Sequence, residues 1–104
     1  MIGIAGHIRT PATTREALQR HIETYVPVCR AEPGCCAFSL AFDALDPEHL
    51  LVFELWQDGM ALAAHVESRH EAAWRQACKR LGTGEHALTR YDIAASAPVG
   101  GAGS

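Results

Sequence analysis

The side chains best suited to proton transfer gather in one stretch of the chain, around a junction between two expected helices. His65 and His70 lie five residues apart, Glu67 lies between them, and Trp74 follows. Imidazole exchanges protons near neutral pH, and an apolar surrounding would tune its pKa further. This stretch is the candidate catalytic region, although an imidazole on a mostly apolar helix is more often a hydrogen-bonded packing residue.

Glu54 and Trp56 precede that region, in the apolar run from Leu50 to Trp56. A carboxylate in such a run must either be paired or reach water. Arg9 or Arg90 on neighbouring strands could supply the cation, so a structural ion pair is favoured over a catalytic acid. Trp56 is by default a core or interface residue, because tryptophan has the largest area to bury.

No metal site is expected. A helix break separates His65 from His70, which argues against a shared ion, and neither a Cys-x-x-Cys motif nor a zinc-finger spacing is present. The thiols are expected to be reduced, small and mostly buried. They are Cys29, Cys35, Cys36 and Cys78.

The elements that position these residues can be read from hydrophobic periodicity. Over residues 2–8, isoleucines alternate with small or polar residues at a period of two, which predicts a strand that ends at Thr10. Thr13 to Glu16 fits a capping box, so a helix should follow and continue through Cys29, bent in its last turn by Pro27.

The rest of the chain alternates between strand and helix patterns. Residues 35–42 and 49–57 predict an antiparallel hairpin, and residues 60–66 a short helix. Ser68 to Glu71 is a second capping box, which opens a helix that runs to about Leu81. Residues 86–94 predict a final strand.

The resulting order, β-α-β-β-α-α-β, is the α+β, ferredoxin-like arrangement: an antiparallel sheet with helices on one face. The other face should be apolar and uncovered. Which of two sets of apolar side chains lies on that face depends on the register of the strands. A homodimer in which the two sheets face each other would cover it. The sets are Leu50, Val52 and Trp56, or Phe38, Leu40 and Phe42.

Size and charge restrict what this chain can be. It has 104 residues, 48% of them hydrophobic and 20% charged, so we expect one globular domain over residues 1–94 and a disordered tail over 95–104. The net charge is −3, and residues 31–68 hold seven acids without any lysine or arginine, which excludes a nucleic-acid partner. No apolar run is long enough for a membrane span and no signal peptide is evident, so we expect a cytoplasmic protein.

Five short motifs, taken in order, resemble the antibiotic biosynthesis monooxygenase family of small dimeric α+β barrel proteins, over about residues 2–94. They are Glu32-Pro33-Gly34-Cys35, Phe53-Glu54-Leu55-Trp56, His65 nine residues after that tryptophan, Ser68-Arg69-His70, and Arg90-Tyr91-Asp92-Ile93.

The resemblance implies a pocket between the sheet and the helices. There His65 would act as the base and His70 as a second polar group, without metal or cofactor. Such chemistry rests on the substrate: a base removes a phenolic proton, and the anion hands an electron to oxygen. The substrate-binding residues would be Trp56, Trp74, Gly6 and Phe38.

Family members also include haem-degrading enzymes, which carry an asparagine where this chain has Gly6 and a tryptophan where it has His65, so haem degradation is disfavoured. The leading hypothesis is a cofactor-independent monooxygenase for a small aromatic or quinol substrate. A non-catalytic dimeric module that binds a small apolar ligand is one alternative. An enzyme that isomerises or degrades a small signal molecule is another.

Overall fold

The computed structural model describes residues 1–100 and confirms the expected order of elements, with one added 3-10 turn, η1. The strands and helices are β1 (Ile2–Arg9), η1 (Ala12–Thr14), α1 (Arg15–Arg30), β2 (Cys35–Phe42), β3 (His49–Trp56), α2 (Gly59–Val66), α3 (Arg69–Arg80) and β4 (His86–Asp92).

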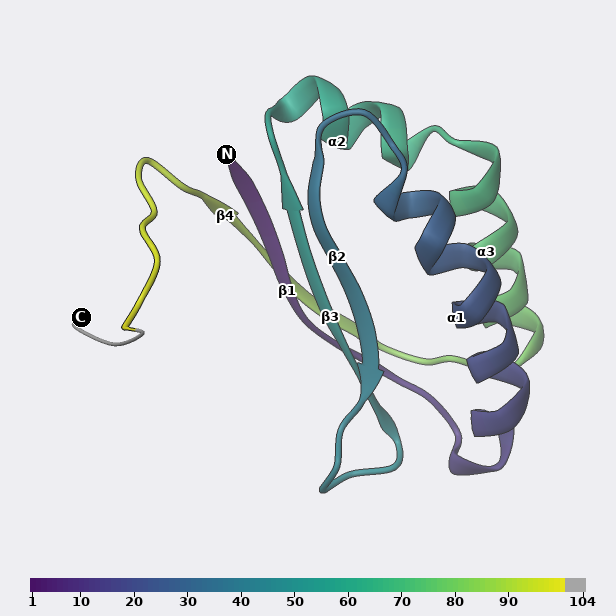
Figure 1. Ribbon diagram of the computed structural model, residues 1–104. Helices are drawn as coiled ribbons and strands as arrows, with labels where there is room; N and C mark the ends of the chain where they lie inside the picture. Colours follow the sequence, from purple (N-terminus) through teal and green to yellow (C-terminus); the bar gives the residue numbers. More distant parts are fainter. Residues whose placement is uncertain (101–104) are drawn as a thin grey trace.

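The four strands form one antiparallel sheet in the order β2-β3-β1-β4. Helices α1 and α3 lie side by side against one face of it, and the short α2 joins the end of β3 to α3 (Figure 1). The prediction of a ferredoxin-like α+β fold with helices on one face is therefore confirmed.

The register of β2 against β3 decides which side chains face the helices. Phe38 pairs with Glu54 and Leu40 with Val52, and Phe42 pairs with Leu50. Residues paired directly across two strands point to the same face. The expectation that one of these sets lies on the open face was therefore wrong, because both sets point toward the helices.

The open face is nevertheless apolar in part, through alternate residues of β3 and a residue of β4. Leu51, Phe53 and Tyr91 are each more than two-fifths exposed on it. An exposed group of large apolar side chains on a sheet is typical of a surface that a partner covers.

The helix starts agree in part with the sequence. Ser68 caps α3 by accepting a hydrogen bond from the Glu71 amide, as predicted, but the Glu71 carboxylate does not return to the cap and instead reaches Tyr25. The first capping box was wrong: Thr13 lies within η1, and α1 begins only at Arg15. Tight 3-10 turns of this kind are common at helix starts, and here the turn takes the place of a side-chain cap.

Beyond the last strand the chain carries no helix or strand up to residue 100, and the end of the predicted disordered tail, residues 101–104, lies outside the described residues. Among residues 1–100, no helix has the length and apolar character that crossing a membrane requires.

Candidate functional site

A cavity of about 340 Å³ lies between the sheet and α3. This volume is within the range of small-molecule sites. Its walls are mostly apolar, its polar groups include Tyr25, Glu54 and Glu71, and the basic side chains of Arg75, Lys79 and His86 also border it. The apolar lining comes from Ile8, Phe38, Leu40, Val52, Trp74 and Leu88.

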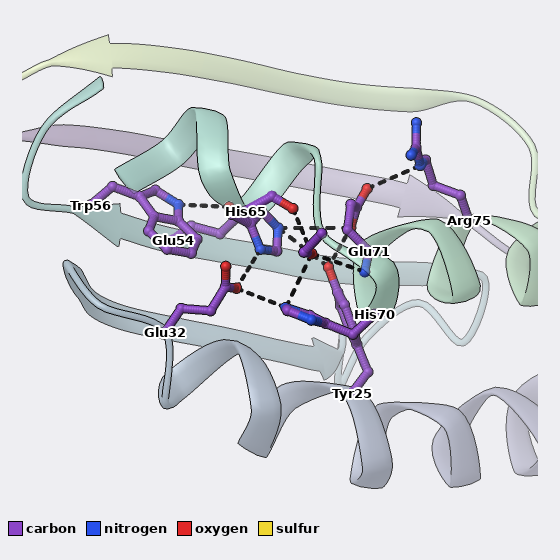
Figure 2. A network of polar contacts seen from close by, with 9 residues as sticks. Tyr25, Glu32, Glu54, Trp56, His65, His70, Glu71 and Arg75 are labelled. Atoms are coloured by element: carbon purple, nitrogen blue, oxygen red, sulfur yellow. Dashed lines mark hydrogen bonds and ion pairs between the residues drawn. The ribbon is translucent and has the colours of Figure 1, made fainter. Parts of the chain in front are cut away.

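Tyr25 and Glu71 join this cavity to the buried His65. The Tyr25 hydroxyl donates to Glu71 Oε2, and His65 Nε2 lies 3.4 Å from that hydroxyl and 3.7 Å from the same carboxylate oxygen (Figure 2). The Arg75 Nε lies 3.4 Å from the other oxygen, Oε1. Glu71 is therefore a carboxylate at the cavity wall with a hydroxyl, an imidazole and a guanidinium around it.

The other nitrogen of His65 is fixed by Glu32. His65 Nδ1 lies 2.7 Å from Glu32 Oε2, and His70 Nε2 lies 2.9 Å from the same oxygen. Because a carboxylate only accepts hydrogen bonds, His65 Nδ1 carries the proton of this bond. The break between α2 and α3, expected to separate the two imidazoles, turns both of them toward one carboxylate (Figure 2).

The turn after α1 brings Glu32 to this position. Gly34 has φ +82°, and a Cβ added there would lie 2.6 Å from the Ala61 side chain on α2. Glycine is needed where the backbone takes a left-handed conformation and a neighbour approaches so closely. This close approach allows the turn, and with it Glu32, to pack beside His65.

Tyr25 remains a neutral donor in this arrangement. Burial, together with its hydrogen bond to Glu71, raises the pKa of the Tyr25 hydroxyl far above its usual range. Its ring stacks on Trp74 with centroids 4.9 Å apart and nearly parallel planes, which fixes the direction of the hydroxyl.

The expected ion pair of Glu54 with Arg9 or Arg90 was wrong. Glu54 instead accepts a hydrogen bond of 2.9 Å from Trp56 Nε1, while Arg9 pairs with Glu48 and Arg90 with Asp92. The register explains the absence of the pair with Arg90, because β1 lies between the two residues and both pair with Ile4. Burial raises the pKa of the Glu54 carboxyl, which the Trp56 hydrogen bond only partly offsets.

The structure places the sequence-predicted site residues at different depths. Phe38 and Trp74 line the cavity. His65 is buried behind the cavity. The fully buried Trp56 packs against it, with the two ring centroids 4.7 Å apart. His70 borders a second cavity, of about 240 Å³, between α1 and α3.

Gly6 lies in the middle of β1, between Val52 of β3 and Leu88 of β4. Both neighbours line the cavity, but Gly6 itself does not. A Cβ at Gly6 would lie 1.9 Å from the backbone carbonyl oxygen of Ala87, so glycine is needed here for the close approach of β1 and β4. Its φ of +150° is a conformation that residues with a side chain rarely adopt.

Sequence reasoning did not identify Tyr25, Glu32 and Glu71 as site residues. By residue type and spacing, Tyr25 fits the apolar side of its helix, Glu32 precedes the turn residues Pro33 and Gly34, and Glu71 belongs to the capping box of the next helix. The signal that could have found Glu71 is the position of its side chain one turn into a helix that starts beside two histidines.

The family profile described as antibiotic biosynthesis monooxygenase matches residues 1–77, which include all the residues of the polar network. The chain belongs to this family. Among its relatives is the probable quinol monooxygenase YgiN of Escherichia coli, which is 27% identical over 89 residues that cover 76% of this chain and 86% of YgiN. The uncharacterized protein sll1783 of Synechocystis is 30% identical over 67 residues, or 64% of this chain, which spans about half of that protein's length (46%).

Solved structures agree with the family fold. A Deinococcus radiodurans protein named for this family superposes with a TM-score of 0.88 at 22% identity, over 97% of this chain and 100% of the other. Rv0793 from Mycobacterium tuberculosis superposes with a TM-score of 0.81 at 26% identity, over 93% of this chain and 98% of the other.

Proposed function

We propose that this protein is a cofactor-independent monooxygenase that oxidises a small aromatic or quinol substrate with molecular oxygen. The observation that carries the proposal is the apolar, partly aromatic cavity with the Glu71 carboxylate at its wall. Phe38 and Trp74 supply aromatic walls for a flat phenolic ring, and Glu71 borders the same cavity as an acceptor for the phenolic proton. YgiN is named a probable quinol monooxygenase, and this name supports the same substrate class.

Glu71 is the group that would take the phenolic proton. It lies at the cavity surface, whereas His65, the base expected from the sequence, stands behind it with Nε2 3.7 Å from Glu71 Oε2. His65 then acts as the next proton acceptor, held in orientation by its bond to Glu32. Tyr25 positions the Glu71 carboxylate by donating to it and is not itself the base.

The reaction balances without an external reductant. A quinol plus O₂ gives a hydroxyquinone plus water: one oxygen atom enters the ring, and the other leaves as water with two protons. The substrate supplies the electrons, two through the new carbon–oxygen bond and two through oxidation of the quinol to the quinone. The protein contributes a dry cavity, orientation and the proton acceptor.

Glu54 complements Glu71 in the same cavity. Its pKa is raised by burial, so this carboxyl holds its proton to higher pH than an exposed glutamate does. Glu54 therefore adds a second carboxyl group, in a more buried environment, to the wall that a substrate would contact.

We further propose that the active form is a homodimer in the cytoplasm, formed through the open sheet face. The exposed Leu51, Phe53 and Tyr91 on that face would be covered by a second copy. A chain of this size buries a modest fraction of its surface alone, so association adds stability.

Oxygen consumption with a panel of substituted hydroquinones tests the function. Wild-type protein should consume oxygen, and Glu71→Gln should lower kcat by about a hundredfold or more, the usual effect of losing a general base. Glu67→Gln is the matched control, because Glu67 is exposed and lies four residues away. Equal rates for wild type and Glu71→Gln would contradict the assignment, and binding without oxygen uptake would favour a ligand-binding module.

A further inference from the structure

Four metal-ligating side chains converge behind the cavity, outside the group of residues that line it. They are Cys29, Glu32, His65 and His70, and one donor atom from each lies within 4.8 Å of every other. Cys29 is in the last turns of α1, Glu32 follows that helix, His65 is on α2 and His70 opens α3. Segments distant in sequence thus supply one compact set of donors.

We propose that these four residues bind a single divalent transition-metal ion of the zinc type. Thiolate, imidazole and carboxylate together are the donor set that proteins use for such ions, and calcium or magnesium would instead require mainly oxygen ligands. The site lies outside the substrate cavity but includes His65, and it goes beyond the proposed oxygen chemistry. When the ion is bound, His65 Nε2 carries the proton and orients Glu71 instead of accepting a proton from it. The ion is assigned a structural, orienting role.

The present distances bracket those of a tetrahedral site. Zinc binds nitrogen and oxygen at about 2.0–2.2 Å and sulfur at about 2.3 Å, which separates neighbouring donors by roughly 3.3–3.7 Å. The two contacts of Glu32 Oε2, 2.7 Å to His65 and 2.9 Å to His70, would have to widen by roughly 0.5–1 Å. The longest separations in the set, which are within 4.8 Å, would have to shorten by up to roughly 1–1.5 Å.

The surroundings also suit an ion. His65 would bind through Nδ1, and its Nε2 faces the Glu71 carboxylate and the Tyr25 hydroxyl, the kind of outer contact that orients metal-bound imidazoles. His70 is one-quarter exposed and borders the second cavity, which offers a route from solvent. Binding would release one proton to solvent, from the Cys29 thiol, while each imidazole would keep its proton on the nitrogen that faces away from the ion.

Cys29 distinguishes this site from a plain hydrogen-bonded network. Its side chain is fully buried within the set of four donors. A sulfur–metal bond at this position has its own spectroscopic signature.

Titration of the metal-free full-length chain with Co²⁺, without substrate, tests the proposal. One equivalent should produce the intense visible bands of tetrahedral cobalt and a near-ultraviolet thiolate-to-cobalt band, and Zn²⁺ should remove both. Cys29→Ser should abolish the near-ultraviolet band, whereas Cys78→Ser should keep it, because Cys78 is also buried but lies outside the cluster.

His70→Gln keeps the test decisive if the Cys29 variant fails to fold, because His70 is partly exposed and its loss leaves the core intact. This variant should bind Co²⁺ at least tenfold more weakly while its circular dichroism is unchanged. Absence of tetrahedral cobalt bands in the wild type, or bands that neither variant alters, would overturn the metal site. Since this experiment uses no quinol and does not measure oxygen uptake, its failure would leave the proposed oxygenase function standing.

Discussion

Gly6→Ala should destabilise the protein strongly, because a Cβ at this position would overlap the backbone of β4. It would lie 1.9 Å from the carbonyl oxygen of Ala87 on β4, which is backbone and cannot rotate away. The φ of +150° adds strain of about 1–3 kcal/mol for a residue with a side chain. Loss of a ladder hydrogen bond between β1 and β4 adds about 0.5–1.5 kcal/mol, for a total of about 3 kcal/mol.

Thermal unfolding at one fixed protein concentration measures this loss. For a domain of this size about 3 kcal/mol lowers Tm by roughly 12–24 °C. Gly59→Ala is the matched control, since its nearest contact would be 3.8 Å away and its φ is not left-handed; it should change Tm by only a few degrees. A Tm of Gly6→Ala within a few degrees of the wild type would refute the reasoning about β1 and β4.

Two further changes test the caps and the buried carboxyl. Ser68→Ala removes the acceptor for the Glu71 amide and should cost about 1 kcal/mol in thermal unfolding, whereas Ser39→Ala on the open face should cost less than half of that. The raised pKa of Glu54 in the folded state means that the wild-type protein loses folding free energy as pH rises above 4.5, where this carboxyl ionises in the unfolded chain. Glu54→Gln does not ionise, so its stability relative to wild type should increase as pH rises above 4.5. Unfolding curves of both proteins over a pH series check the sign, and a difference independent of pH would contradict it.

The fold could be predicted almost completely from the sequence, because periodicity reports which face of an element is buried. The strand pattern of residues 35–42 and 49–57 located both strands of the hairpin. Periodicity does not report register, however. That both apolar sets face the helices follows from the pairing of Phe38 with Glu54, which depends on the turn between the strands.

The site was predictable only in part, because it is assembled from distant segments. His65 and His70 attract attention by residue type alone. Glu32 has no such signal, since a glutamate before Pro33 and Gly34 is typical of a turn, and its role becomes visible only when Gly34 brings the turn against α2. Cys29 fits the buried stripe of its helix equally well as a packing residue or as a ligand.

Isotopically labelled oxygen gas tests the central claim most directly. The wild-type protein is incubated with its best hydroquinone under labelled O₂, and the product is analysed by mass spectrometry. The proposed function predicts one labelled oxygen atom in the hydroxyquinone and one in water, with product formation greatly reduced in Glu71→Gln. Product without label, or a quinone formed with release of peroxide, would contradict monooxygenation.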